Sequence, residues 1–149
     1  MKLKIKAVSP LIGTAIPAPF YASPGAAAMD LHAAVDTQVE IGPGGLCSVP
    51  TGIAIALPSA EYVALVFARS GLATRHGIAL SNGVGVVDSD YRGEIKVGLV
   101  NLSDKLYTVL PGDRIAQLAV VPVERAELEL VSELDETERG TGGFGSTGR

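Results

Sequence analysis

The chain has 149 residues and a mass of 15.3 kDa. This size predicts one domain with a core large enough to fold without disulfides or structural metal ions. Hydrophobic residues make up 47% and charged residues 19%, which excludes a wholly disordered chain. The net charge of −4 argues against a protein that binds nucleic acid through a basic face. The single cysteine, Cys47, excludes an internal disulfide and argues against a thiolate zinc site.

The sequence predicts neither a membrane protein nor a secreted one. No apolar run reaches the ~18 residues that a spanning helix needs. Residues 1–10 lack the apolar region of a secretory signal. We therefore expect a cytoplasmic protein with no membrane partner and no nucleic-acid partner.

Alternation of polar and apolar residues dominates the chain. Residues 2–6 alternate lysine with leucine and isoleucine, which predicts a strand with one solvated face and a sheet edge protected by charge. Turn signals rich in glycine and proline separate the later segments. Many short strands about ten residues apart predict a β-sandwich or β-barrel. The further expected strands are residues 37–41, 53–57, 62–68, 83–87, 94–101, 115–123 and 126–131.

One short helix is expected after the strand at residues 62–68. Ser70 could cap a turn over residues 71–76, and Gly77 could end it in the left-handed conformation.

The C-terminal segment 140–148 holds five glycines in nine residues, and it has two interpretations. Composition alone favours a frayed tail. The alternative is a mobile arm that orders over a ligand, because glycine lets backbone N–H groups approach a phosphate. Ser146 and Thr147 would add hydroxyl donors, and Phe144 would offer a ring for stacking on a base.

Several charged residues stand beside apolar strands, where an unpaired charge is costly. Asp30, Arg69, Asp88 and Arg114 could form ion pairs that close the ends of a barrel. They could also belong to a site that hydrolyses a polyphosphate, which needs donors to the phosphates, a metal and a base beside the attacking water. The donors would be Arg69, Ser70, Gln117 and Arg139, and the carboxylates for Mg²⁺ or for the water would be Asp30, Asp88 and Asp90.

Five segments in order resemble the five motifs of the trimeric dUTP pyrophosphatases, and residues 50–53 match a structural stretch of the same family. The segments follow the family's order and are spread over the chain from residue 27 to residue 148. The first motif carries Ala28 where the family usually has glycine. The five segments are residues 27–31, 69–73, 82–94, 112–118 and 139–148.

This resemblance implies an all-β, jelly-roll-like β-barrel over residues 1–138, with one short helix and a flexible glycine-rich arm over residues 139–149. It implies a homotrimer whose sites are shared between subunits. It also implies Mg²⁺-dependent hydrolysis of dUTP to dUMP and pyrophosphate, which limits uracil entry into DNA and supplies dUMP for thymidylate synthesis.

The resemblance also implies roles for single residues. Asp88 matches the carboxylate that activates water. Asn82 and the backbone at Val86 and Val87 match the groups that read uracil, and Tyr91 matches the ring that packs under the deoxyribose. Asp30 matches the acidic residue near the metal, acting through water. The other implied substrate contacts are Arg69, Ser70, Gly71 and Gln117 at the phosphates, Lys96 at the nucleotide, Arg139 at the γ-phosphate, Phe144 on the uracil ring, and Gly145 and Ser146 in the arm.

Two alternatives remain at this point. A dCTP deaminase, alone or combined with the diphosphatase activity, would share the barrel, but the segment Arg69-Ser70-Gly71 and the Phe144 arm favour dUTP. A nucleotide-binding regulator without turnover is the alternative from another class. The presence of Asp88, Tyr91, Arg139 and Phe144 together argues against it.

Overall fold

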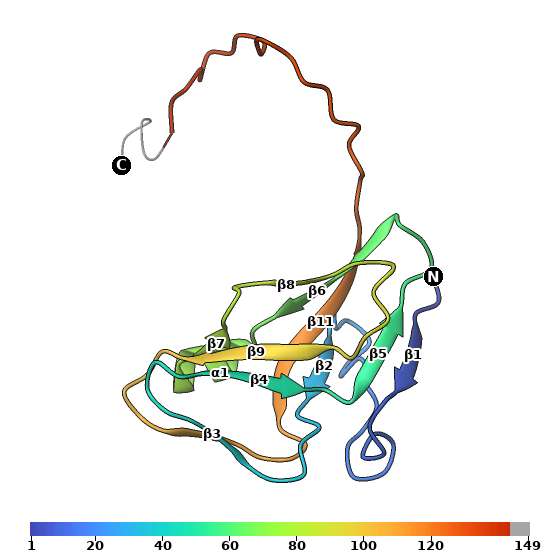
Figure 1. Cartoon of the computed structure of the whole chain (residues 1–149), viewed down its shortest axis with the longest axis vertical. Helices are drawn as coiled ribbons and strands as arrows, with labels where there is room; N and C mark the ends of the chain where they lie inside the picture. Colours follow the sequence, from blue (N-terminus) through green and yellow to red (C-terminus); the bar gives the residue numbers. More distant parts are fainter. Residues whose placement is uncertain (144–149) are drawn as a thin grey trace.

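The computed structural model describes residues 1–143, which form eleven strands and one short helix (Figure 1). This confirms the prediction of an all-β fold with a single helix. The helix α1 (Ser70–His76) lies between β6 and β7. The strands are β1 (Lys4–Ala7), β2 (Met29–His32), β3 (Val39–Ile41), β4 (Leu46–Pro50), β5 (Ile53–Ala56), β6 (Tyr62–Phe67), β7 (Ile78–Leu80), β8 (Gly85–Val87), β9 (Lys96–Asn101), β10 (Tyr107–Val109) and β11 (Arg114–Pro122).

The strands pair antiparallel in four sheets that enclose one apolar core. The largest sheet has the order β2-β11-β6-β8, and a second has the order β4-β9-β7. Two-stranded sheets, β1-β5 and β10-β3, complete the wall. Hydrogen bonds do not join the described sheets into one closed barrel. The core residues with less than 2% exposed surface include Leu31, Ile53, Ile78, Leu99, Ile115 and Leu118.

The prediction of a strand at residues 126–131 is wrong for the isolated chain. Residues 123–131 are exposed and extended, and they lead away from the body (Figure 1). Leu128 is 93% exposed and Leu130 fully exposed. The alternating pattern is present, but a strand also needs a neighbour that takes its backbone hydrogen bonds. Four short strands that the pattern did not predict, β2, β4, β7 and β10, do find such neighbours.

The end of α1 was predicted correctly and its start was not. Gly77 adopts φ 68°, and its N–H donates to the carbonyls of Ala73 and Leu72. Arg69, rather than Ser70, occupies the N-cap position, and no side chain caps the helix. At seven residues, α1 is far too short to span a bilayer, and residues 1–143 contain no other helix.

Asn101 is a fully buried polar residue whose amide is completely hydrogen-bonded. Its Nδ2 donates to the carbonyls of Ile41 and Lys105 at 2.8 and 2.7 Å. Its Oδ1 accepts from the backbone N–H and the hydroxyl of Ser103 at 3.0 and 2.7 Å. The amide therefore ties the end of β9 to β3 and to the following turn.

The turn at residues 50–53 is joined to the segment that precedes β9. The Thr51 hydroxyl donates to the carbonyl of Ile95 at 2.6 Å. The Gly52 N–H donates to Oε1 of Glu94 at 2.9 Å, and the Ile95 N–H donates to the carbonyl of Ile53 at 2.9 Å. These bonds fix one end of the loop at residues 88–95, which matters for the site described below.

Gly52→Ala should lower the free energy of unfolding by about 2–4 kcal/mol. Gly52 has φ +70°, and an added Cβ would lie 2.8 Å from Cβ of Ala34 and 2.9 Å from Cγ1 of Ile12. Gly44→Ala is the matched control, because Gly44 has φ +69° but open space around it, so only strain of roughly 1–2 kcal/mol applies. Urea unfolding measures both variants. Equal losses would contradict the packing argument.

Candidate active site

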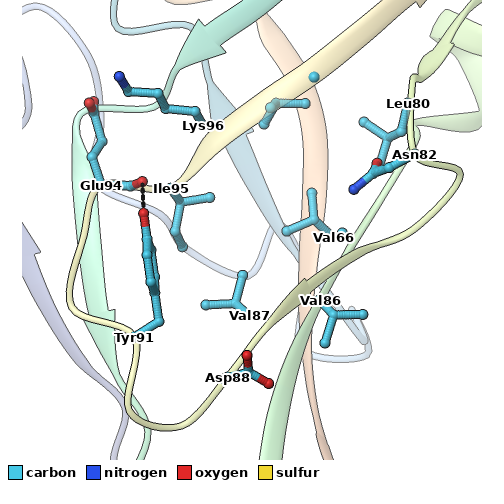
Figure 2. A pocket seen from close by; sticks show the side chains of 13 residues that line it. Val66, Leu80, Asn82, Val86, Val87, Asp88, Tyr91, Glu94, Ile95 and Lys96 are labelled. Atoms are coloured by element: carbon cyan, nitrogen blue, oxygen red, sulfur yellow. Dashed lines mark hydrogen bonds between the residues drawn. The ribbon is translucent and has the colours of Figure 1, made fainter.

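A cavity of about 540 Å³ opens between β8, β9 and the loop at residues 88–95 (Figure 2). Its lining is apolar on the core side and polar at the mouth, an arrangement typical of small-molecule sites. The cavity brings together six of the residues that the sequence singled out as candidates, namely Asn82, Val86, Val87, Asp88, Tyr91 and Lys96.

The strand β8 supplies one wall of the cavity through its backbone. It is the last strand of its sheet and pairs only with β6 among the described strands. Its other edge therefore offers N–H and C=O groups that no described strand takes. Asn82 adds a side-chain amide that points toward the cavity in Figure 2. The site thus presents alternating donors and acceptors along one line.

Tyr91 forms part of the opposite wall and is held at both ends. Its backbone N–H donates to the carbonyl of Asp88 at 3.2 Å, and its hydroxyl donates to the carbonyl of Glu94 at 3.0 Å (Figure 2). The ring lies so close to Gly93 that a Cβ there would be 2.6 Å from Cζ of the tyrosine. The ring is 46% exposed, so one face remains available to a ligand.

Asp88 stands at the rim of the cavity, directly after β8. Successive side chains of a strand point to opposite faces. Val87 accordingly faces the interior, whereas Val86 and Asp88 point away from it in Figure 2. A second hollow of about 420 Å³ on that other side is also lined by Val86 and Asp88. The carboxylate is therefore accessible from outside the cavity.

A second group of candidate residues gathers at the far end of the same sheet. The Arg69 Nε donates to Oδ1 of Asp30 at 3.0 Å, and the Arg114 guanidinium donates to Oδ2 at 3.2 Å. Gln117 donates to the carbonyl of Ala68 at 3.2 Å. The ion-pair interpretation is thus confirmed for Asp30, Arg69 and Arg114, while Asp88 makes no ion pair with any residue from 1 to 143.

One chain does not bring its two groups together. Val87 pairs with Ala64 on β6, and Asp88 lies one residue beyond this pair. Arg69 lies five residues further along in the opposite direction. At about 3.3 Å per residue, more than roughly 16 Å of extended backbone separates them. Ser70 and Gly71 follow Arg69 at the start of α1 and lie with it.

The face of the sheet between the two groups is apolar, although it is partly exposed. Leu65 pairs with Ala119 and with Val86, and Val63 pairs with Val121, all on this outer face. Val86 is 62% exposed. The opposite face carries the buried core residues. An antiparallel sheet with one solvated face normally has polar residues there, so this face is suited to burial against another surface.

The two histidines lie outside the cavity. His32 is buried, its Nδ1 has no hydrogen-bond partner among the described residues, and burial lowers the pKa of its imidazole. Asp30 opposes this shift, while Arg114 and Arg69 add to it. His76 packs at a tilt against Tyr107, with ring centroids 5.4 Å apart. Burial raises the pKa of the Tyr107 phenol, and neighbouring Asp113 adds to that rise. Neither histidine is positioned as a base for the cavity.

The arm is described only in part. Arg139 is exposed, and its Nε donates to the carbonyl of Gly142 at 2.9 Å. It contacts neither group of candidate residues in the single chain. Phe144, Gly145 and Ser146 lie outside the described residues, and their predicted roles stay predictions.

The donor set of the described residues limits how a metal ion could bind. Residues 1–143 hold no group of three or more His, Cys, Asp or Glu side chains that could form a metal site. Each oxygen of Asp30 already accepts from a guanidinium. These residues therefore fit a Mg²⁺ that is held mainly by phosphate oxygens and water, with a protein carboxylate reaching it through water.

Two residues that the sequence interpretation left without a site role have defined contacts here. Glu94 lines the cavity, and its carboxylate is bound by the Gly52 N–H. Arg114 shares Asp30 with Arg69. Both stand inside recognised motifs, but the contacts join positions 42 and 84 residues apart, which no local pattern reveals.

Comparison with known proteins agrees with this architecture. The family model for dUTPase matches residues 14–148. A deoxyuridine 5'-triphosphate nucleotidohydrolase of Desulfitobacterium hafniense is 56% identical over 130 residues, covering 87% of this chain and 86% of that protein. One of Serratia proteamaculans is 47% identical over 148 residues, covering 99% and 97%. The structure of the Staphylococcus bacteriophage 80alpha dUTPase with dUpNHpp has a TM-score of 0.86 at 26% identity and covers 99% of both chains.

The fold and the cavity define an all-β protein with a cavity of small-molecule size beside a free strand edge. The family match and the two relatives make the assignment specific. The chain belongs to the dUTPase family.

Proposed function

We propose that this protein hydrolyses dUTP to dUMP and pyrophosphate. The observation that carries the proposal is the cavity at the free edge of β8, where Asn82, Tyr91 and Asp88 meet in a chain of the dUTPase family. The relatives are named as deoxyuridine 5'-triphosphate nucleotidohydrolases, and a structural neighbour carries dUpNHpp. The names of both relatives describe hydrolysis, and none of these names indicates a deaminase.

Uracil fits the edge of β8 by its hydrogen-bonding pattern. The base has two carbonyl acceptors flanking one N–H donor. Backbone groups at Val86 and Val87, together with the Asn82 amide, can match that pattern. Cytosine carries an amino group in place of one carbonyl, so its binding would leave donors facing each other, at a cost of about 1–3 kcal/mol.

The ring of Tyr91 discriminates between sugars by shape. We assign its exposed face to the deoxyribose, where a 2′-hydroxyl would overlap the ring. This selection needs no charge. The hydrogen bond from the Tyr91 hydroxyl to the Glu94 carbonyl keeps the ring from turning aside.

Asp88 is the proposed general base. Its carboxylate removes a proton from a water molecule, and the water oxygen forms a bond to the α-phosphorus. The bond from that phosphorus to the bridging oxygen of the β-phosphate breaks, and pyrophosphate leaves with the electron pair. Asp88 directly follows a paired strand, so its backbone is held, as a base requires.

Mg²⁺ is the proposed cofactor, and the family implies it. When bound, the ion neutralises charge on the triphosphate oxygens. Asp30 would contact it through water, since both carboxylate oxygens are engaged by arginines. Lys96, which lines the cavity from β9, is the proposed further contact to the nucleotide.

A neighbouring chain is proposed to supply the phosphate contacts, in a homotrimer whose stoichiometry is implied by the family. Arg69, Ser70, Gly71 and Gln117 of one chain lie too far from its own Asp88 to contact the same triphosphate. The apolar outer face between the two groups is suited to burial against a second copy of the chain. Such burial would bring the phosphate group of one chain to the Asp88 of another.

The exposed segment over residues 123–141 is proposed to reach a neighbouring chain. Residues 139–149 would then close over the nucleotide, with Arg139 at the γ-phosphate, Phe144 on the uracil ring, and Gly145 and Ser146 at the phosphates. Closure would exclude bulk water and leave only the positioned water near the phosphorus. A cytoplasmic location remains a prediction.

A nucleotide panel tests the activity. Pyrophosphate release with Mg²⁺ should have a kcat/KM at least about 100-fold higher for dUTP than for dTTP, dCTP or UTP.

Asp88→Asn should lower kcat about 100-fold or more with KM within a few-fold, because the side chain keeps its shape and loses its basicity. Equal rates on all four nucleotides, ammonia release from dCTP, or an unchanged kcat in Asp88→Asn would contradict the proposal.

Mixing two inactive variants tests whether the site is shared. Asp88→Asn and Arg69→Ala are each expected to be nearly inactive alone. After co-refolding at equal amounts, about one quarter of the sites should pair an intact Asp88 with an intact Arg69 from another chain. Activity should therefore return to about a quarter of the wild-type value. Activity no greater than that of the separate variants would show that each chain builds its own site.

Deleting residues 139–149 tests the arm. The truncated protein should keep its circular dichroism spectrum and its size in solution, because residues 139–143, the described part of this segment, add no buried side chain to the core. Its kcat/KM for dUTP should fall about 100-fold or more, since charged donors and water exclusion are both lost. Full activity of the truncated protein would contradict the arm hypothesis and favour the interpretation of this segment as a frayed tail.

A further inference from the structure

The position of Tyr91 depends on a backbone carbonyl, and that carbonyl needs support of its own. The Tyr91 hydroxyl donates to the carbonyl of Glu94 at 3.0 Å. Residues 88–93 form an exposed turn, and the described residues give the Tyr91 ring no other hydrogen bond. If residue 94 shifts, the ring loses its anchor. The question is therefore what holds Glu94.

The Glu94 side chain supplies a support in addition to the backbone bonds of Ile95 described above. Its Oε1 accepts from the Gly52 N–H at 2.9 Å. Gly52 lies close to Ile12 and Ala34, and its carbonyl accepts from the Val8 N–H at 2.8 Å. The Glu94 carboxylate is therefore a side-chain link between the loop at residues 88–95 and the packed turn at residues 50–53.

The adjacent Gly93 makes room for the ring in its observed position. A side chain at residue 93 would overlap the tyrosine ring, so the absence of a Cβ lets the ring lie flat against the backbone. The ring therefore has one supported place, set by Gly93 on its side and by Glu94 at its hydroxyl end.

We infer that Glu94 is a positioning residue for sugar discrimination, acting through Tyr91 rather than on the substrate. The inference rests on the proposed function, in which the tyrosine ring excludes a 2′-hydroxyl. Because one carboxylate oxygen is bound to Gly52, the role requires an acceptor at that place and not a negative charge. Glutamine can supply the acceptor, whereas alanine cannot.

Glu94→Ala should reduce the ratio of kcat/KM for dUTP over UTP by about 3- to 10-fold, the range expected for one anchoring hydrogen bond. Most of the change should come from faster UTP hydrolysis. Glu94→Gln should keep the wild-type ratio. Glu40→Ala is the matched control, because Glu40 is an exposed carboxylate on β3 whose described contact is a 3.4 Å bond from Gln38.

Tyr91→Phe removes the hydrogen bond to the Glu94 carbonyl and leaves the Glu94 side chain unchanged. Because Tyr91 is exposed, this variant should fold normally. It should lower the ratio in the same direction. Combining Tyr91→Phe with Glu94→Ala should give no further loss, because both remove one linked interaction. Additive losses, or a wild-type ratio in either single variant, would overturn the inference.

A measurement without substrate separates this inference from the proposed function. In protein carrying meta-fluorotyrosine, the ¹⁹F signal of Tyr91, assigned through Tyr91→Phe, should shift or broaden in Glu94→Ala and stay in place in Glu94→Gln. If the wild-type protein shows no preference for dUTP, the proposed function alone is refuted. An unmoved signal in folded Glu94→Ala would refute the role of Glu94 alone.

Discussion

Between Gln117 and Asp88 the sheet β2-β11-β6-β8 is apolar on both faces, and the rest of the structure depends on that constraint. One face, with Leu118 and Val66, fills the core. The other face, with Leu65 and Ala119 in register, remains half-exposed in the single chain. A sheet of this kind gains its full hydrophobic stabilisation only when a second surface covers it. Folding of one chain and its association with another are therefore parts of the same energetic problem.

The chemistry is arranged around this face. Arg69 and Gln117 stand at one end of it, and Asp88 stands at the other. Within one chain this distance looks like a defect. In the proposed assembly the same distance would become a means of completing a site only after association, since cations and a carboxylate would stay apart until the face is buried. Asp30 keeps the Arg69 charge paired meanwhile.

The sequence predicted the periodic parts of the fold and failed where a partner decides. Strands β6 and β11 are largely apolar runs, and both were predicted to within one residue. The pattern at residues 126–131 is regular, yet it forms no strand because no described segment pairs with it. The cap of α1 was misassigned to Ser70 because Arg69 binds Asp30, a contact between distant positions. For the cavity, motifs identified Asn82 and Tyr91, but not the Glu94 contact with Gly52.

The free edge of β8 has a consequence for how substitutions act. Any residue except proline offers the same backbone N–H and C=O, so a base read by the main chain is insensitive to the identity of the side chains at positions 86 and 87. Substitutions at these two positions would alter the volume of the cavity and leave the hydrogen-bonding pattern of the backbone intact. Substitutions in β8 would therefore change the affinity for a ligand and would leave the selectivity for the base unchanged.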